Sequence, residues 1–140
     1  MIKNFSELKE NIADAFQYYT FVILEKSIEG RELEVSTFEY QDQVCITKPG
    51  EIISPVKFYS YEEKYSASSK TKTIPVADNI SDKALEKIAT YSKMAFNQLR
   101  LRHLARIDFF LTDKEEVYIN EINTFPGHTE ISMFPQMMEA

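Results

Sequence analysis

Three oxygen-bearing side chains in the last third of the sequence could bind a hard divalent cation. Residues 103–111 alternate strictly, which puts Arg106 and Asp108 on the face opposite the apolar residues, and Glu121 and Asn123 share one face of a second predicted strand. A short turn between the strands would bring the polar faces together if they match. Carboxylate and amide oxygens are the ligands that Mg²⁺ prefers. The pattern predicts an oxygen-only metal site, although two surface carboxylates on a solvated strand would give the same spacing.

Groups that could contact an anion lie on and beyond these strands. Arg106 could stabilise a phosphoryl oxygen or a developing oxyanion, or it could neutralise Asp108 as a structural ion pair. Gly127 follows in a Pro-Gly loop, where an unblocked backbone N–H can approach a ligand. Ser132 precedes a short helix that we expect to begin around Met133. Its position suits a carboxylate site or helix capping, and spacing alone favours capping.

The elements that must position these residues are predicted from apolar periodicity. Helices are expected over residues 5–19 and from Ser81 onward, the second with an inner face of Leu85, Ile88, Ala95 and Leu99. Strands are expected over residues 20–26, 32–40, 43–47, 52–56, 103–111 and 117–123. Residues 57–80 lack either periodicity, which is typical of a functional or disordered loop. These elements predict one α+β domain over residues 1–140, a mainly antiparallel sheet with flanking helices.

Composition narrows the function classes. The 140 residues contain 16 basic and 22 acidic side chains, a formal charge of −6, which argues against a nucleic acid or an anionic membrane as partner. A polyanion remains compatible if a divalent cation bridges it to carboxylates. Cys45 is the only cysteine, so no internal disulfide can form, and the chain contains no apolar segment of signal-peptide or membrane-span length. The cytoplasm is the expected compartment, and without His or Cys pairs at ligand spacing zinc is not expected.

Four ordered sequence blocks resemble the D-alanine–D-alanine ligases of the ATP-grasp superfamily. The blocks are EKSIEGRE at 25–32, PGEI at 49–52, YEEKY at 61–65, and ARID at 105–108 followed by NEINTFPG at 120–127, Thr129 and SM at 132–133. One block alone would be a weak signal, whereas four in order make a specific one. The resemblance implies an ATP-dependent cytoplasmic ligase, homodimeric at full length, that joins two D-alanines for peptidoglycan synthesis through an acyl phosphate.

The resemblance also implies a role for each matched residue. The ATP-binding residues would be Glu25, Lys26, Ile28, Glu32 and Lys64, with the acid at 32 on the ribose hydroxyls. Two Mg²⁺ ions, which Mn²⁺ could replace, would be bound by Asp108, Glu121 and Asn123. The catalytic groups would be Arg106 and the Gly127 N–H on the oxyanion, with Lys64 and Tyr65 in a loop that closes over the phosphates. The carboxylate of the second D-alanine would be bound by Ser132 and Met133.

The sequence also departs from the family pattern. Family members have an N-terminal domain and a glycine-rich phosphate loop before the matched part and a final helix after it. With glycine only at Gly30, Gly50 and Gly127, this chain has no such loop. The resemblance therefore implies the C-terminal part of an ATP-grasp domain, inactive by itself. His128 stands where the family usually has an apolar residue.

Two other functions are compatible with these blocks. One is a sibling ligase that uses D-serine or, less readily, D-lactate as its second substrate; Lys64-Tyr65 resembles the dipeptide and D-serine types. The other is a non-catalytic nucleotide- or metal-binding module. The joint presence of Arg106, Lys64 and the three predicted metal ligands argues against it, because binding alone needs no oxyanion group.

Overall fold

The structure, a computed structural model, describes residues 2, 4–54 and 71–140. Its elements in chain order are α1 (Phe5–Ala15), β1 (Arg31–Tyr40), β2 (Gln43–Ile46), β3 (Gly50–Ile53), β4 (Lys72–Ile74), α3 (Asp82–Gln98), β5 (Leu104–Leu111), β6 (Val117–Asn123) and α4 (Met133–Glu139). The described strands form one six-stranded sheet in the order β4-β3-β1-β5-β6, with β2 paired to β1, and every pair is antiparallel. The predicted α+β fold is confirmed.

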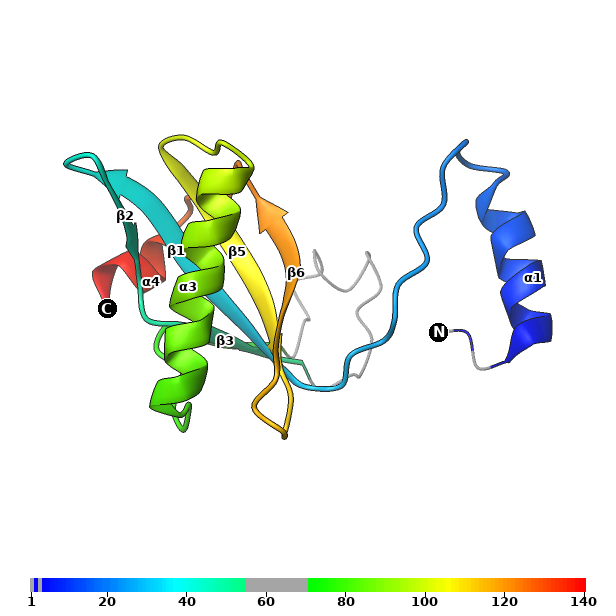
Figure 1. Ribbon diagram of the computed structural model, residues 1–140, viewed down its shortest axis with the longest axis horizontal. Helices are drawn as coiled ribbons and strands as arrows, with labels where there is room; N and C mark the ends of the chain where they lie inside the picture. The colour runs from blue at the N-terminus through cyan, green and yellow to red at the C-terminus, as the bar shows by residue number, and fades with distance from the viewer. Residues whose placement is uncertain (1, 3, 55–70) are drawn as a thin grey trace.

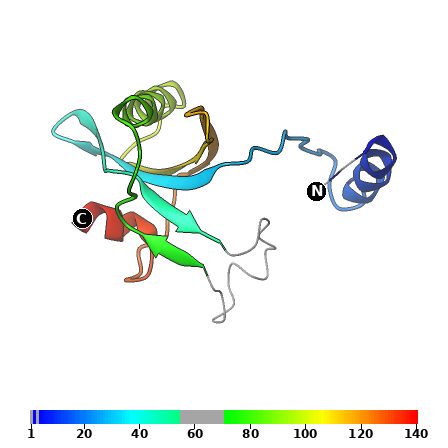
Figure 2. The ribbon, with the colours of Figure 1, turned by 90° about the horizontal axis from the view of Figure 1, so that it is seen from below.

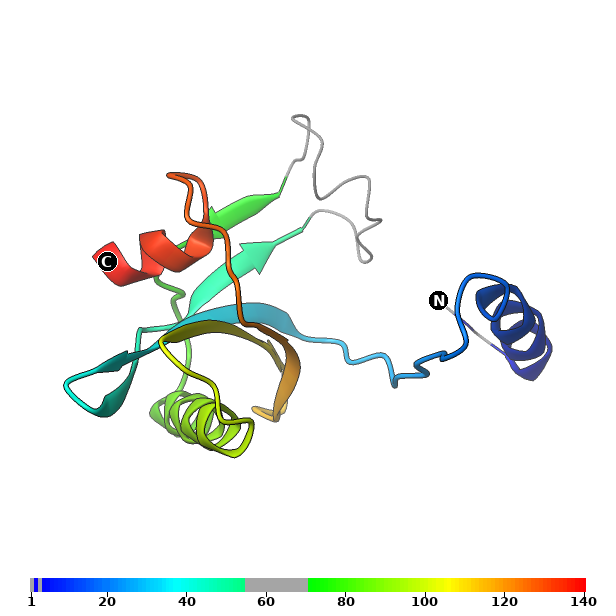
Figure 3. The ribbon, with the colours of Figure 1, turned by 90° about the horizontal axis from the view of Figure 1, so that it is seen from above.

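Two helices cover opposite faces of this sheet, α3 on one side and α4 on the other (Figures 2 and 3). The central strand β1 lies between them, and its residues 33–37 are all buried. Leu33 and Val35 belong to the core under α3. Ser36, on the other face, donates a hydrogen bond from Oγ to the backbone oxygen of Phe134 in α4 at 3.0 Å. Because side chains alternate along a strand, β1 has an apolar face under α3 and a polar face toward α4.

Helix α3 begins as predicted, with Ser81 Oγ accepting a hydrogen bond from the Ala84 N–H at 3.2 Å. The predicted inner face is only partly right. Ile88 is buried, but Leu99 is 58% exposed. The buried residues are Ala84, Ile88, Ser92 and Phe96, a four-residue repeat. The hydrophobic pattern missed this repeat because one of its residues, Ser92, is polar. Ser92 can be buried because its Oγ donates a hydrogen bond to the Ile88 carbonyl at 2.8 Å.

The predicted strand over residues 20–26 is wrong. These residues are extended but pair with no described strand, and Phe21 and Ile23 are 80% and 82% exposed. Helix α1 ends at Ala15 and buries none of its residues. Figure 1 shows it standing apart from the sheet at the end of this extended segment. A short apolar run predicts a strand, but a strand forms only where a second strand lies beside it to complete the backbone hydrogen bonds.

The region after β3 differs in detail from the prediction. The strand expected over residues 52–56 begins at Gly50 and ends at Ile53. Within the span expected to be a loop, Lys72–Ile74 form β4, which pairs with β3. Lys64 and Tyr65 lie outside the described residues. None of the helices in the described part of the chain combines the length and apolar character needed to cross a membrane.

Candidate active site

The predicted polar pairing of the last two strands is confirmed. In the β5–β6 register Asp108 lies opposite Glu121, and Arg106 lies opposite Asn123. Direct cross-strand partners place their side chains on the same face of a sheet. All four residues therefore lie on the face opposite α3, because their neighbour Ile107 is part of the core under that helix.

A further acid, Glu34, joins this row from β1. It lies opposite Asp108 in the β1–β5 register, so three carboxylates cross three neighbouring strands in the order Glu34, Asp108, Glu121. Glu34 is 8% exposed. Sequence reasoning missed it. The available signal was its place between Leu33 and Val35, which assigns it to the polar face of β1.

Arg106 contacts two of these carboxylates. Its Nε and Nη2 donate to the two carboxylate oxygens of Asp108, both at 2.8 Å, and its Nε lies 3.4 Å from Oε1 of Glu34. The hydrogen bonds that Arg106 donates to Asp108 raise the pKa of the guanidinium above its ordinary value. The charges of Asp108, Glu34 and Glu121 act in the same direction, whereas burial lowers this pKa. Arg106 is thus a permanent cation among these carboxylates, and the ion pair with Asp108 that the sequence allowed is formed.

The donor chemistry of this face suits a hard cation. Asp108 and Glu121 offer carboxylate oxygens, and Asn123 offers an amide oxygen that accepts a hydrogen bond from the Phe125 N–H at 3.0 Å. In the part of the chain that the structure describes, no three His, Cys, Asp or Glu side chains are gathered closely enough to hold a metal by themselves. A cation here would need the Asn123 amide and oxygens from water or a phosphate, as Mg²⁺ commonly does.

A β-bulge next to Asp108 sets the orientation of β6. The register passes from Asp108–Glu121 to Phe109–Ile119, which leaves Asn120 as the extra residue. Bulges turn side chains toward a site and are frequent beside active sites. Beyond this bulge Phe110 lies opposite Tyr118, and both side chains reach the pocket described next.

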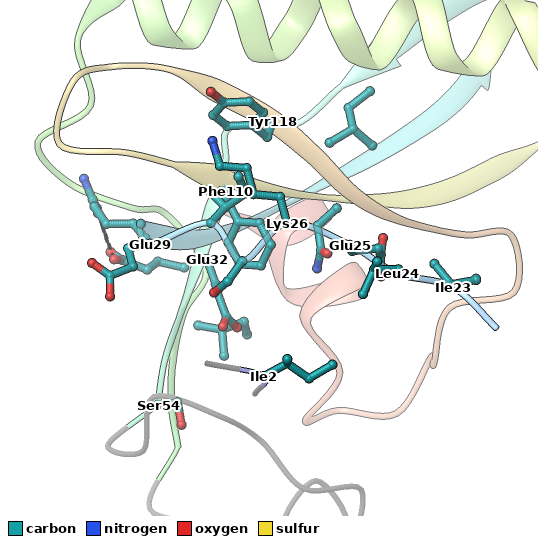
Figure 4. Close-up of a pocket in the computed structure, with 18 of the residues that line it drawn as sticks. Ile2, Ile23, Leu24, Glu25, Lys26, Glu29, Glu32, Ser54, Phe110 and Tyr118 are labelled. Atoms are coloured by element: carbon teal, nitrogen blue, oxygen red, sulfur yellow. Dashed lines mark hydrogen bonds and ion pairs between the residues drawn. The ribbon is translucent and has the colours of Figure 1, made fainter. Parts of the chain in front are cut away.

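An open pocket of about 1300 Å³ lies where β1 begins and β5 ends (Figure 4). Its walls include four of the five predicted ATP-binding residues, Glu25, Lys26, Ile28 and Glu32. Sequence reasoning missed other lining residues, among them Glu51, Ile52, Phe110, Tyr118 and Asn120. Helix α1 contributes Leu8 and Asn11, but none of its residues is buried, whereas the sheet side of the pocket belongs to the packed strands. Aromatic and aliphatic side chains beside acids and a lysine suit a ligand with a flat apolar ring, hydroxyls and negative charge.

The rim of the pocket is fixed by Arg31. Its guanidinium binds Glu51 across two strands at 2.8 and 2.7 Å, and it donates to the backbone oxygens of Asp78 at 2.8 Å and Asn79 at 3.1 Å. The hydrogen bond to Glu51 raises the pKa of Arg31 above its ordinary value. Arg31 therefore ties the start of β1 to β3 and to the segment before α3, beside Glu32.

The loop between β6 and α4 crosses the polar face of the sheet (Figure 3). Ser132 Oγ lies 2.8 Å from Thr129 Oγ1 and accepts from the Thr129 N–H at 3.1 Å. Ser132 stands at the expected N-cap position of α4, but its side chain makes no capping hydrogen bond to that helix. A Cβ added to Gly127 would lie 2.9 Å from Ser132 Oγ, which places these two predicted site residues side by side.

Packing contacts hold His128 in this loop and Met133 at the start of α4. Met133 is 6% exposed, and its side chain packs against Gly50 at the start of β3. His128 packs its ring on Phe134 with the centroids 5.1 Å apart, and its Nδ1 lies 2.9 Å from the Pro126 carbonyl. The histidine at position 128 is therefore held by Phe134 of α4 and by the loop backbone.

Comparisons with known proteins agree with this geometry. Residues 1–140 match the family model described as "D-ala D-ala ligase C-terminus". The chain is 51% identical to the D-alanine–D-alanine ligase of Vibrio atlanticus over 99% of its own length and 42% of the relative, and 50% identical to that of Aeromonas hydrophila over 97% and 42%. It thus spans about two fifths of the length of these curated relatives.

Solved structures give the same result. D-alanyl-alanine synthetase A from Vibrio cholerae aligns with a TM-score of 0.71 and 53% identity, covering 82% of this chain and 35% of that one. The VanG D-Ala:D-Ser ligase from Enterococcus faecalis aligns at 0.79 and 31%, covering 97% and 39%. The shared fold is the α+β architecture of the ATP-grasp ligases. The chain belongs to the D-alanine–D-alanine ligase family.

Proposed function

We propose that this chain provides the adenine, metal and oxyanion side of an ATP-dependent ligase that joins two D-alanines to D-alanyl-D-alanine. The observation that carries the proposal is the row of Arg106, Asp108, Glu121 and Asn123 on one sheet face, next to a pocket that Glu32 lines. A nucleotide-binding module alone would not require a permanent cation among the carboxylates proposed to bind the metal. The family match makes peptidoglycan synthesis the natural use of the product.

In this proposal the pocket binds ATP. Glu32 would accept hydrogen bonds from the ribose hydroxyls, and Phe110 and Ile52 would pack against the base. Glu25, Lys26 and Ile28 would hold the rest of the nucleotide, partly through their backbone groups. A structural neighbour from Bacillus anthracis, 25% identical with a TM-score of 0.76, is a D-alanine–D-alanine ligase complexed with ATP, which supports this part of the proposal.

Asp108, Glu121 and Asn123 would hold Mg²⁺, or Mn²⁺ in its place. A divalent cation there would neutralise phosphate charge and bridge the nucleotide to the acidic sheet face. The proposed reaction has two steps. The carboxylate of the first D-alanine takes the γ-phosphoryl group of ATP and becomes an acyl phosphate. The amine of the second D-alanine attacks the acyl carbon, and phosphate leaves.

The remaining site residues would act on the second step. Arg106 and the Gly127 N–H would stabilise the tetrahedral oxyanion, since preorganised donors at a developing charge are among the largest contributions to catalysis. Ser132 Oγ and the Met133 backbone would orient the carboxylate of the attacking D-alanine. Lys64 and Tyr65 would close over the phosphates and exclude water. A homodimer in the cytoplasm is proposed for the whole enzyme, where the half-buried Cys45 would stay reduced.

The test uses an "assembled ligase", defined as the Vibrio atlanticus relative with its matched part replaced by this chain. Product analysis with ATP, Mg²⁺ and D-alanine, alone or with equimolar D-serine or D-lactate, should give D-alanyl-D-alanine, ADP and phosphate as the main products. The 140-residue chain alone should give no dipeptide, because in this proposal the groups that align the first carboxylate with the γ-phosphate would come from the rest of the enzyme.

Other products of the assembled ligase would indicate a different function. Preferential use of D-serine or D-lactate would assign the chain to a sibling ligase. A correctly folded assembled ligase that binds Mg-ATP but forms no product would assign it to a non-catalytic module. Dipeptide formation by the 140-residue chain near the assembled rate would contradict the proposed division of the active site.

A further inference from the structure

We propose that Glu34 is a positioning residue of the ligation site, which shares the Arg106 guanidinium with Asp108 and holds it when Asp108 binds a divalent cation. The inference rests on the proposed function, in which Asp108 is a metal ligand and Arg106 stabilises the oxyanion. It adds a residue that lies outside all four sequence blocks of the family resemblance.

The geometry of Arg106 raises the need for such a residue. Asp108 currently uses both carboxylate oxygens to bind the guanidinium, each at 2.8 Å. A cation that coordinates one of these oxygens also repels the positively charged guanidinium, so metal binding weakens this ion pair. Arg106 then needs another partner if it is to remain on the polar face.

Glu34 is placed to be that partner. Its Oε1 lies 3.4 Å from Arg106 Nε, already within ion-pair distance. The strands that carry the two residues are paired without interruption from Arg31–Leu111 to Phe38–Leu104. A guanidinium can therefore shift from Asp108 to Glu34 by side-chain rotation alone, without movement of the backbone.

Burial argues that this carboxylate has more than a packing role. The Glu34 side chain is 11% exposed and that of Arg106 is 21% exposed. Charges removed from water are costly, and a buried ion pair is often no more stabilising than apolar residues of similar volume. Core packing alone would be served by an apolar residue at position 34. The buried acid is instead at the one place in β1 that faces Asp108.

The proposal predicts how metal binding depends on Glu34. With position 34 neutral, Arg106 has Asp108 as its remaining close anchor and competes with the cation for the same oxygens. Metal affinity should fall, and the guanidinium should be less well fixed when the cation is bound. Partners that orient metal ligands typically contribute about 10- to 100-fold in metal affinity or activity.

The experiment measures Mn²⁺ binding to the assembled ligase by electron paramagnetic resonance in the presence of ADP, without turnover. Glu34→Gln should weaken Mn²⁺ binding about tenfold. Glu39→Gln is the matched control: it lies on the same strand and forms an ion pair with Arg102 at 3.1 Å, away from the site, and it should leave the affinity unchanged. Near-ultraviolet circular dichroism and the thermal midpoint check that each variant is folded. In steady-state assays Glu34→Gln should lower kcat about tenfold or more, with the KM for ATP within about threefold.

A double-mutant cycle separates this role from a structural one. In the Arg106→Gln background no guanidinium competes for Asp108, so adding Glu34→Gln should cause no further loss of Mn²⁺ affinity. The same tenfold loss in that background would overturn the proposal. If Glu34→Gln does not fold, Glu34→Asp retains the charge but withdraws it from Arg106, and an unchanged affinity in that variant would overturn the proposal as well.

The failure of this inference can be told apart from failure of the proposed function. Mn²⁺ binding that is insensitive to Asp108→Asn would contradict the proposed metal site itself. Mn²⁺ binding that requires Asp108 but is the same in Glu34→Gln and Glu39→Gln would contradict only the role of Glu34.

Discussion

Asp108 and Glu121 are direct cross-strand partners, and the register between their strands shifts immediately after them. The shift places Val117 opposite Leu111, where it is buried in the core, and Tyr118 opposite Phe110, at the pocket. One extra residue in β6 therefore lets the same pair of strands carry an acidic row and one wall of a pocket on a single face.

Phe110→Ala is expected to weaken ATP binding. If the Phe110 ring packs against the base, its removal should raise the KM for ATP of the assembled ligase by about tenfold, the usual scale for one base–aromatic contact. Tyr91→Ala, an exposed aromatic on α3, is the control and should leave this KM unchanged. Equal KM values for ATP in the two variants would contradict the proposed contact between Phe110 and the base.

Gly127→Ala is expected to impair the binding of D-alanine through Ser132. The new methyl group would lie 2.9 Å from Ser132 Oγ, so the hydroxyl must move from its position beside Thr129. The KM of the second D-alanine should rise severalfold while the KM for ATP is retained. In a Ser132→Ala background the hydroxyl is absent, so Gly127→Ala should cause little further rise in the KM of the second D-alanine. An undiminished effect there would contradict the contact with Ser132 Oγ as the cause.

Breaking the Arg31–Glu51 pair is expected to destabilise the chain more than breaking a surface pair. Arg31→Met removes hydrogen bonds to a side chain that is 13% exposed and to two backbone carbonyls, so the free energy of unfolding should fall by about 1–3 kcal/mol. Arg102→Met is the matched control, because Arg102 is 77% exposed in its pair with Glu39 and should contribute less than about 1 kcal/mol. Urea unfolding of the 140-residue chain measures both, and equal losses would contradict the role given to Arg31.

Glu39 should make the stability of the chain depend on acidic pH. The hydrogen bond from the His103 backbone N–H, followed by that from Arg102, lowers the pKa of Glu39 below its ordinary value of 4.5. The unfolded chain therefore takes up the proton first, so the stabilisation is fully present above pH 4.5 and is lost as the pH falls through the folded-state pKa. Glu39→Gln should be less stable than the parent near pH 7, and the difference should shrink below about pH 4.

The control for this pH effect is Asp113→Asn, an exposed carboxylate in the β5–β6 turn. Its stability near pH 7 should differ little from that of the parent. A Glu39→Gln difference that is constant from pH 7 to pH 3 would show that the interaction does not depend on the ionised carboxylate.

Local patterns predicted much of this site, and non-local contacts explain what they missed. The strands that carry Asp108 and Glu121 are joined by a short turn, so alternation and the turn together predict which residues meet. Glu34 is more than seventy positions from Asp108 in the sequence, and nothing local indicates that β1 pairs with β5. The pocket residues of β3 were missed for the same reason.

Errors in the fold prediction have a related cause. The apolar residues 20–26 have the composition of a strand, but composition does not reveal whether a pairing partner exists. The buried repeat of α3 passes through Ser92, which a hydrophobic pattern assigns to the surface. The three residues of β4 are too few for an alternation to be recognised.

The acidic face of the sheet is tested most directly by the rate of the chemical reaction itself. D-alanine-dependent phosphate release by the assembled ligase is measured in a single turnover with saturating Mg-ATP, comparing the parent, Asp108→Asn and Glu39→Gln. If Asp108 binds the catalytic metal, Asp108→Asn should lower the rate by about a hundredfold while the protein stays folded, and Glu39→Gln should match the parent. A folded Asp108→Asn enzyme that releases phosphate at the parental rate would contradict the assignment of this sheet face as the active site.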